Sequence, residues 1–156
     1  MSRIFVVKKC RLGRGLFAAR DIKKGEVIFY FNGKIMSGNE VVKSGREPYP
    51  IQIGDDKYMD WGEPGELINH SCNPNAGVKN DNHVIAIKNI KKGEEITWDY
   101  STSMDEDCWT MKCYCGSKNC RKRIRDFKYL PKNLQKRYLK LGIVQSFIAK
   151  KFAKMV

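Results

Sequence analysis

The chain has 156 residues, a length that predicts a single domain with enough apolar side chains for a hydrophobic core. Hydrophobic residues make up 42% of the sequence and charged residues 30%, which excludes a fully disordered chain. No apolar run reaches the length of a membrane span or of a signal-peptide core, so we expect an intracellular protein without a membrane partner.

The net charge of +13 is concentrated near the C-terminus. Residues 121–156 hold 12 Lys and Arg against one acid, Asp126, whereas residues 1–120 hold 18 bases and 16 acids. Such a tail suits nucleic acid, an acidic protein or an anionic lipid surface. A solvated helix face would have the same composition, and charge alone does not separate these interpretations.

Residues 3–100 predict mainly short strands, separated by turns that contain Gly or Asn. The expected strands are, in chain order, 3–7, 15–19, 26–31, 49–53, 57–61 and 83–86. The run 26–31 is rich in β-branched and aromatic residues and is followed by Asn32-Gly33, a favoured turn dipeptide. Only 37–44 has helical character in this half of the chain. These features predict a mainly β protein.

A short motif occurs twice in this β region. Asp21-Ile-Lys-Lys-Gly-Glu-Val-Ile28 is echoed 68 residues later by Asn89-Ile-Lys-Lys-Gly-Glu-Glu-Ile96. In each copy a Lys-Lys-Gly turn is flanked by apolar residues, which predicts a tight turn that leads into a buried strand. Two copies are too few for a solenoid, so we expect two similar strand-turn-strand units within one domain.

After Pro131 the pattern becomes helical. Leu134, Tyr138 and Leu141 have helical spacing. Gly142 interrupts the series, and a second apolar stripe follows it. We expect two short helices whose apolar faces pack on the β body, in preference to a membrane or a partner protein.

Three of the six cysteines lie within eight residues, in the pattern Cys113-x-Cys115-x4-Cys120. In an intracellular chain, this clustering points to metal ligation rather than to disulfides. Zn²⁺ takes four ligands in structural sites, so a fourth must come from elsewhere. From the residues alone, five side chains qualify: Cys72, Cys108, Cys10, His70 and His83.

Three further segments carry residues suited to a binding site. Leu67-Ile-Asn-His-Ser-Cys-Asn-Pro-Asn75 is rich in hydrogen-bonding side chains, as a polar ligand or a capped turn requires. Gly93-Glu-Glu-Ile-Thr-Trp-Asp-Tyr100 ends a predicted strand in an aromatic residue, an acid and a tyrosine. Gly13-Arg-Gly15 lets backbone N–H groups approach a ligand closely, but it lacks the third glycine of a dinucleotide fold.

In this order and spacing, the cysteine pattern and the three segments resemble the SET-domain protein lysine methyltransferases. The resemblance extends from about Arg11 to Arg121. It implies a fold of several small curved sheets with a pseudoknot, in which the Asn-His-Ser segment passes under a loop to lie beside residues 97–100. It also implies three parts: a SET catalytic domain at 1–103, a post-SET zinc-binding segment at 104–122, and a basic helical extension at 123–156 that packs on the body.

The resemblance implies transfer of a methyl group from S-adenosylmethionine to a lysine ε-amine. Tyr100 matches the family's active-site tyrosine, and Tyr49 or Tyr58 is the second tyrosine of the lysine channel, with Tyr49 preferred from its place in the sequence. Trp98 stands where relatives usually carry Phe or Tyr, a position that tunes how many methyl groups are added. Glu66 stands where many relatives have Arg.

The resemblance also implies the residues that bind cofactor and metal. The cofactor-binding residues would be Arg14, Gly15, Leu16, Asn69, His70, Tyr100 and Trp109. For Trp109, a stacking position on the adenine and a core or lid position both remain open. The structural Zn²⁺ would be held by Cys72, Cys113, Cys115 and Cys120, which leaves Cys10 and Cys108 as free thiols.

Two acidic stretches, within 55–66 and at 105–107, favour a basic, lysine-rich protein substrate such as a histone or another chromatin protein. Exposed acids also occur without any partner. The basic tail would then contact nucleic acid and place the protein on chromatin, in a nucleus or in the cytoplasm and nucleoid. The alternative is a zinc-containing, non-catalytic module of the same fold that binds nucleic acid or peptides.

Overall fold

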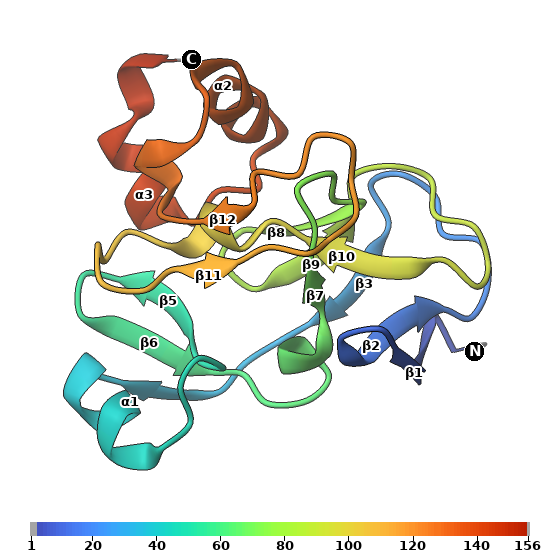
Figure 1. Cartoon of the computed structure of the whole chain (residues 1–156), viewed down its shortest axis with the longest axis horizontal. Coiled ribbons are helices and arrows are strands. Elements are labelled where there is room, and N and C mark those ends of the chain that lie inside the picture. The colour runs from blue at the N-terminus through green and yellow to red at the C-terminus, as the bar shows by residue number, and fades with distance from the viewer. Residues whose placement is uncertain (1–2, 156) are drawn as a thin grey trace.

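The computed structural model describes residues 3–155, so the ends of the predicted parts at residues 1, 2 and 156 lie outside the described residues. Short strands predominate, and the helices are few (Figure 1). The strands are β1 Phe5–Cys10, β2 Gly13–Ala18, β3 Val27–Tyr30, β4 Lys34–Met36, β5 Ile51–Gly54, β6 Lys57–Asp60, β7 Asn69–His70, β8 Ala76–Lys79, β9 His83–Ala86, β10 Glu95–Trp98, β11 Met111–Lys112 and β12 Arg123–Ile124. The α-helices are α1 Gly38–Ser44, α2 Lys132–Leu141 and α3 Ser146–Lys151.

The strands form several small sheets rather than one large one. Their orders are β1-β2-β10-β7, β3-β9-β8, β4-β6-β5 and β11-β12. The N-terminal strands and the C-terminal helices lie on different sides of the molecule, with β8, β9 and β10 between them, and β5, β6 and α1 lie below the C-terminal helices (Figure 1). The predicted mainly β architecture of small sheets is confirmed.

The two Lys-Lys-Gly turns face each other. Ile22 and Ile90 form an isolated antiparallel bridge through two backbone hydrogen bonds of 2.8 and 2.9 Å. Each turn contains a glycine with positive φ, +87° at Gly25 and +88° at Gly93. Side chains rarely permit this conformation. The repeated motif therefore supplies the two halves of one contact.

The Asn32-Gly33 turn joins two sheets and does not close a hairpin. β3 pairs with β9, whereas β4 pairs with β6. A Cβ atom at Gly33 would lie 1.9 Å from the carbonyl oxygen of Asp60. The glycine is therefore required by a close approach of two backbones.

Two segments that are distant in the sequence meet where β7 pairs in parallel with β10. Asn69 lies opposite Thr97, and His70 lies opposite Trp98. Asn75 fastens the junction, since its Nδ2 donates to a carbonyl of β10 at 2.8 Å and its Oδ1 accepts from the N–H of Thr97 at 2.9 Å. This is the juxtaposition that the family resemblance implied.

The helices form where capping and apolar spacing favour them. α1 begins with a capping box in which Ser37 and Glu40 each accept a backbone N–H of the other. α2 ends at Gly142, whose φ is +66°. In residues 3–155, no helix is both long and apolar enough to cross a membrane.

Two apolar clusters account for most of the core. The larger lies between the sheets, around Leu16, Ile22, Ile90 and Ile96, which are all essentially inaccessible. The second joins the sheets to the C-terminal helices and consists of Ile85, Ile87, Phe127, Leu130, Tyr138, Ile143, Val144 and Ile148.

Candidate active site

A cavity of about 820 Å³ opens between the β1–β2 turn, the loop before β5 and the segment that follows β10. Its aromatic lining consists of Tyr49, Tyr58, Trp61, Trp98, Tyr100 and Trp109. Glu47, Gln52 and Asn69 add polar groups. A cavity of this volume and mixed lining fits a small-molecule ligand together with an inserted side chain.

Tyr100 lies in the cavity wall directly after β10. Its hydroxyl donates a 2.9 Å hydrogen bond to the carbonyl of Ile68. Its ring packs against His70 and Trp98, with centroids 5.2 and 5.3 Å apart. Burial raises the pKa of the Tyr100 phenol. The site therefore presents a fixed hydroxyl that keeps its proton.

Asn69 ties the Gly-x-Gly turn to β7. Its Nδ2 donates to the carbonyl of Arg14 at 3.1 Å and to the carboxylate of Glu95 at 2.7 Å. Gly15 lies against this junction, and a Cβ there would be 2.5 Å from Glu95 Oε1 and 2.9 Å from Asn69 Nδ2. The second glycine of the motif therefore makes room for protein groups.

Only part of the predicted cofactor-binding backbone at 14–16 reaches the cavity wall. Arg14 lines the cavity together with Leu12 and Gly13. Gly15 is buried, and Leu16 is completely inaccessible in the core. Of the three predicted residues, Arg14 lies in the cavity wall, and Gly15 and Leu16 lie behind it.

His70 is buried and is not among the residues that line the cavity. Its Nδ1 accepts from the backbone N–H of Tyr100 at 3.2 Å, and its Nε2 lies 3.3 Å from Cys72 Sγ. Burial lowers the pKa of His70 to about 4, so the ring is neutral at neutral pH. It connects the tyrosine segment to the cysteines from behind the cavity.

Both candidates for the second tyrosine line the cavity. Tyr49 is 49% exposed. Tyr58 donates its hydroxyl proton to the Glu106 carboxylate. Burial is the main reason that the pKa of Tyr58 is raised, and this hydrogen bond raises it further. The hydroxyl of Tyr58 is therefore engaged, whereas Tyr49 forms no side-chain hydrogen bond within residues 3–155.

The two tryptophans of interest occupy different depths. Trp98 is 4% exposed and packs against Trp61 with ring centroids 5.6 Å apart. Its indole N–H has no partner among the described residues. Trp109 lines the cavity and also packs against the cluster that contains Cys72 and Cys113. A stacking position and a core or lid position for Trp109 both stay predictions.

Asp99, between two predicted site residues, connects more elements than the motif suggested. Its side chain is fully buried, and its oxygens accept bonds of 2.8 and 2.7 Å from the Arg121 guanidinium. Oδ2 also accepts from the hydroxyl of Tyr138 in α2 at 3.0 Å. The sequence feature that could have indicated this role is an acid at the end of an apolar strand. Such an acid is expected to be buried, and a buried carboxylate needs a partner.

Other lining residues belong to no motif. Gln52 is 5% exposed, and its Oε1 accepts from the N–H of Asp105 at 2.8 Å. A glutamine between two isoleucines in a predicted strand was the available signal. Glu106, from the acidic stretch at 105–107, also lines the cavity. Glu47 and Met111 line it too, and nothing in their local sequence indicates this.

Four sulfur atoms come together beside this site. The Sγ atoms of Cys72, Cys113, Cys115 and Cys120 lie within 4.8 Å of one another. Burial raises the pKa of Cys72 to about 11, so its thiolate needs a cation. Four thiolates in a closed set fit a tetrahedral Zn²⁺. Cys10 and Cys108 lie outside the cluster.

Comparison with known proteins assigns the family. Residues 13–101 match the SET domain. The chain is 32% identical over 139 residues to histone-lysine N-methyltransferase 2D of Homo sapiens, covering 78% of this chain and 2% of the relative. It is 33% identical over 129 residues to histone-lysine N-methyltransferase trithorax of Drosophila virilis, covering 72% and 3%. The chain belongs to the SET-domain family.

A solved structure supports the same assignment. ctPRC2 in an autoinhibited conformation bound to S-adenosylmethionine has a TM-score of 0.57 and 27% identity, over 68% of this chain and 16% of that one. The chain thus spans only a small part of the relatives that it matches. The predicted family, with its post-SET-like cysteine cluster, is confirmed.

Proposed function

We propose that this chain is a protein-lysine N-methyltransferase that uses S-adenosylmethionine. The observation that carries the proposal is the cavity, because its wall joins Tyr100, Trp98 and Asn69 from two distant segments. The relatives are named histone-lysine N-methyltransferases, and one related structure holds S-adenosylmethionine. Volume and lining suit such a cosubstrate at one end and a lysine at the other.

S-adenosylmethionine supplies a methyl group on a sulfonium, and the lysine that accepts it must be neutral. A free lysine has a pKa of about 10.4. Aromatic walls exclude water from an entering ammonium and so lower its pKa. Because the Tyr100 hydroxyl donates to Ile68, its oxygen retains lone pairs that accept an amine N–H and orient the amine.

The remaining site residues divide by position. Asn69, Arg14 and Trp109 would form the cofactor side, with Gly15, Leu16 and His70 supporting them from behind. Tyr49 and Trp98 would form the lysine side. We propose that the bulk of Trp98, held in place by Trp61, limits how many methyl groups the cavity admits.

The acidic residues near the cavity indicate which part of the site could attract a basic substrate. Most of the predicted acidic stretches are neutralised inside the chain: Asp60 and Glu66 by Arg46, Glu63 by Arg14, Asp55 and Asp105 by Lys151, and Asp107 by Lys128. Among the acids that line the cavity, Glu47 and Glu106 form no ion pair within the described residues. We propose that these two meet basic residues of a lysine-rich protein such as a histone.

The proposal extends to the whole segment. A structural Zn²⁺ at Cys72, Cys113, Cys115 and Cys120 would hold 104–122 against the catalytic part at 1–103. The basic extension at 123–156 would contact nucleic acid on chromatin, in a nucleus.

Replacement of Tyr100 by Phe tests the function. Transfer of labelled methyl from S-adenosylmethionine to a histone mixture should fall at least about 100-fold, because a hydroxyl at the reacting amine is lost. Cosubstrate affinity, measured by calorimetry, should survive. The control is Tyr30→Phe, at a residue that is 65% exposed. Unchanged turnover would remove Tyr100 from the mechanism, and cosubstrate binding without transfer by the unaltered chain would favour the non-catalytic module.

A further inference from the structure

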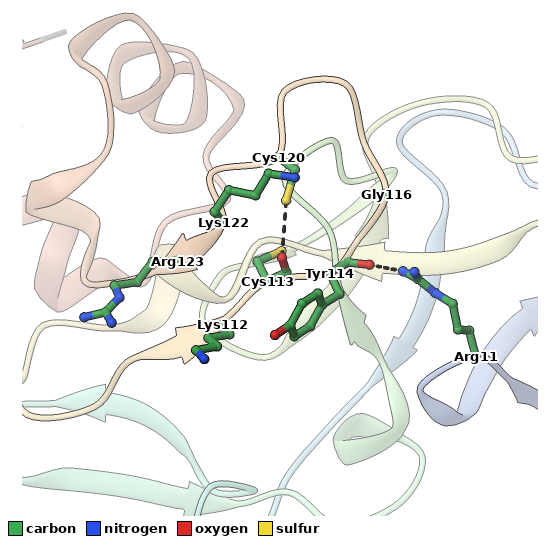
Figure 2. A pocket seen from close by; sticks show the side chains of 8 residues that line it. All are labelled: Arg11, Lys112, Cys113, Tyr114, Gly116, Cys120, Lys122 and Arg123. Atoms are coloured by element: carbon green, nitrogen blue, oxygen red, sulfur yellow. Dashed lines mark hydrogen bonds between the residues drawn. The ribbon is translucent and has the colours of Figure 1, made fainter.

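A second hollow, of about 570 Å³, lies beside the cysteine cluster. Four cations line it: Arg11 directly after β1, Lys112 in β11, Lys122 before β12 and Arg123 in β12 (Figure 2). The ring of Tyr114, a residue that is 63% exposed, stands among them between Lys112 and Arg11 (Figure 2). Among the described residues, no carboxylate lines this basic hollow.

The basic hollow is separate from the aromatic cavity. Successive residues of a strand point to opposite faces. Met111 accordingly lines the aromatic cavity, and Lys112 lines the basic hollow. No residue lines both. A ligand in the basic hollow would leave the proposed lysine site free.

The four cations lack counter-charges. Within residues 3–155 none of them forms an ion pair, unlike Arg121, Lys128 and Lys151 of the same basic region. Lys112 also stands directly opposite Arg123 in the β11–β12 ladder. Like charges at such a position destabilise a sheet. An anion bound between the two would relieve that repulsion.

The loop that carries Tyr114 is fixed in place. Arg11 Nη2 donates to the carbonyl of Tyr114 (Figure 2). A guanidinium has five N–H donors, so most of them remain for a ligand. The same loop carries Cys113, Cys115 and Cys120 of the cysteine cluster.

We propose that the basic hollow binds single-stranded nucleic acid, with backbone phosphates at the four cations and an unpaired base stacked on Tyr114. An isolated phosphate would use the cations but not the ring. In a duplex the bases are already stacked, and the ring would again have no role. Cations interleaved with an exposed aromatic ring are the usual surface for a single strand.

Fluorescence anisotropy with a labelled single strand of about 20 nucleotides, alone and annealed to its complement, tests the proposal. Tyr114→Ala should weaken single-strand binding about tenfold while the salt dependence stays the same. The double variant Lys112→Gln, Lys122→Asn should reduce the slope of log affinity against log salt by about 1.4. Asn suits position 122 because φ there is +64°.

The matched control is Lys34→Gln, Lys43→Gln, which removes two exposed cations of β4 and α1, outside both the hollow and the basic extension. It should leave the slope within error of the unaltered chain. An equal loss in the control would mean diffuse attraction and overturn the proposal. So would an unchanged affinity in Tyr114→Ala, or a duplex that binds as tightly as the single strand. Metal content and S-adenosylmethionine binding, measured for each variant, verify that it folds. If the double variant loses the metal or S-adenosylmethionine binding, the result for Tyr114→Ala alone tests the proposal.

Discussion

The carboxylate of Asp99 and the guanidinium of Arg121 are both withdrawn from water, with side-chain exposures of 0% and 16%. Removing each ion from water costs roughly several kcal/mol, and only well-aligned hydrogen bonds between the two ions offset this cost. Here the contact is bidentate, and the Tyr138 hydroxyl donates a further bond. Because either partner alone would be left uncompensated, the pair acts as a unit that joins β10 to the C-terminal part.

Replacing Asp99 with Ala should therefore lower the free energy of unfolding by about 3–5 kcal/mol. Urea-induced unfolding followed by circular dichroism measures it. Asp55→Ala is the matched control, since Asp55 pairs with Lys151 while its side chain is 79% exposed. That pair should contribute less than about 1 kcal/mol. Equal losses of unfolding free energy in the two variants would show that the buried Asp99–Arg121 pair is no more important for stability than an exposed pair.

Glu106 shows the opposite effect of burial on a single carboxylate. Burial raises its pKa above the ordinary value, despite the hydrogen bond from Tyr58. An acid with a raised folded pKa stabilises the fold when protonated, and that stabilisation is lost as pH rises through the folded pKa. Ionising the Glu106 carboxylate therefore lowers the stability of the folded chain.

Glu106→Gln should consequently be at least as stable as the unaltered chain at neutral pH, with its advantage shrinking as pH falls toward about 4.5. Urea unfolding of both chains across that range measures the difference. Affinity for a lysine-rich peptide should fall at the same time. An advantage that grows toward acid pH would contradict the raised pKa.

At the scale of elements, local pattern predicted strands better than it predicted how they join. The runs 26–31, 57–61 and 83–86 were recognised because they are β-branched, aromatic or alternating, and they correspond to β3, β6 and β9. β8 was missed, since Ala-Gly-Val-Lys has little strand preference of its own. It exists because β9 pairs with it, close to Ile143, which lies 2.8 Å from where a Cβ of Gly77 would be.

In the candidate site, too, local sequence predicted some residues, while others depended on contacts between distant segments. The spacing of Cys113, Cys115 and Cys120 predicted three ligands from local sequence. Cys72, whose Sγ is 3.8 Å from that of Cys113, lies 41 residues away, and only the family resemblance selected it. No local rule brings β7 beside β10, because the paired residues lie 28 positions apart in the sequence.

The cysteine cluster makes a prediction at this scale. The chain purified with reductant should hold one zinc ion, and its removal by a chelator should loosen 113–120 and lower methyl transfer. Cys115→Ser should lose the metal, as measured by mass spectrometry of metal content. Cys108→Ser is the control, because Cys108 is exposed and outside the cluster. Full activity of metal-free protein would refute a structural role.

For the whole molecule, the question is whether the C-terminal helices are an appendage or part of one cooperative unit. Their apolar side chains share a core with Ile85, Ile87 and Phe127, and the N–H of Gln145 donates to the carbonyl of Thr102 at 3.0 Å. Sequence periodicity predicted both helices, but their coupling to the cavity through Tyr138 and Asp99 depends on tertiary contacts alone.

Ile148→Ala resolves this question, because Ile148 is fully buried in α3 and the truncation should cost about 2–5 kcal/mol. All three tryptophans, Trp61, Trp98 and Trp109, line the aromatic cavity, so their fluorescence reports on the cavity and its surroundings and not on the helices. In one cooperative unit, the fluorescence and circular dichroism transitions should move to lower urea together. Lys150→Ala, an exposed position of the same helix, should leave both within about 0.5 kcal/mol. A fluorescence transition that stays in place while helicity is lost would show that the helices fold independently of the site.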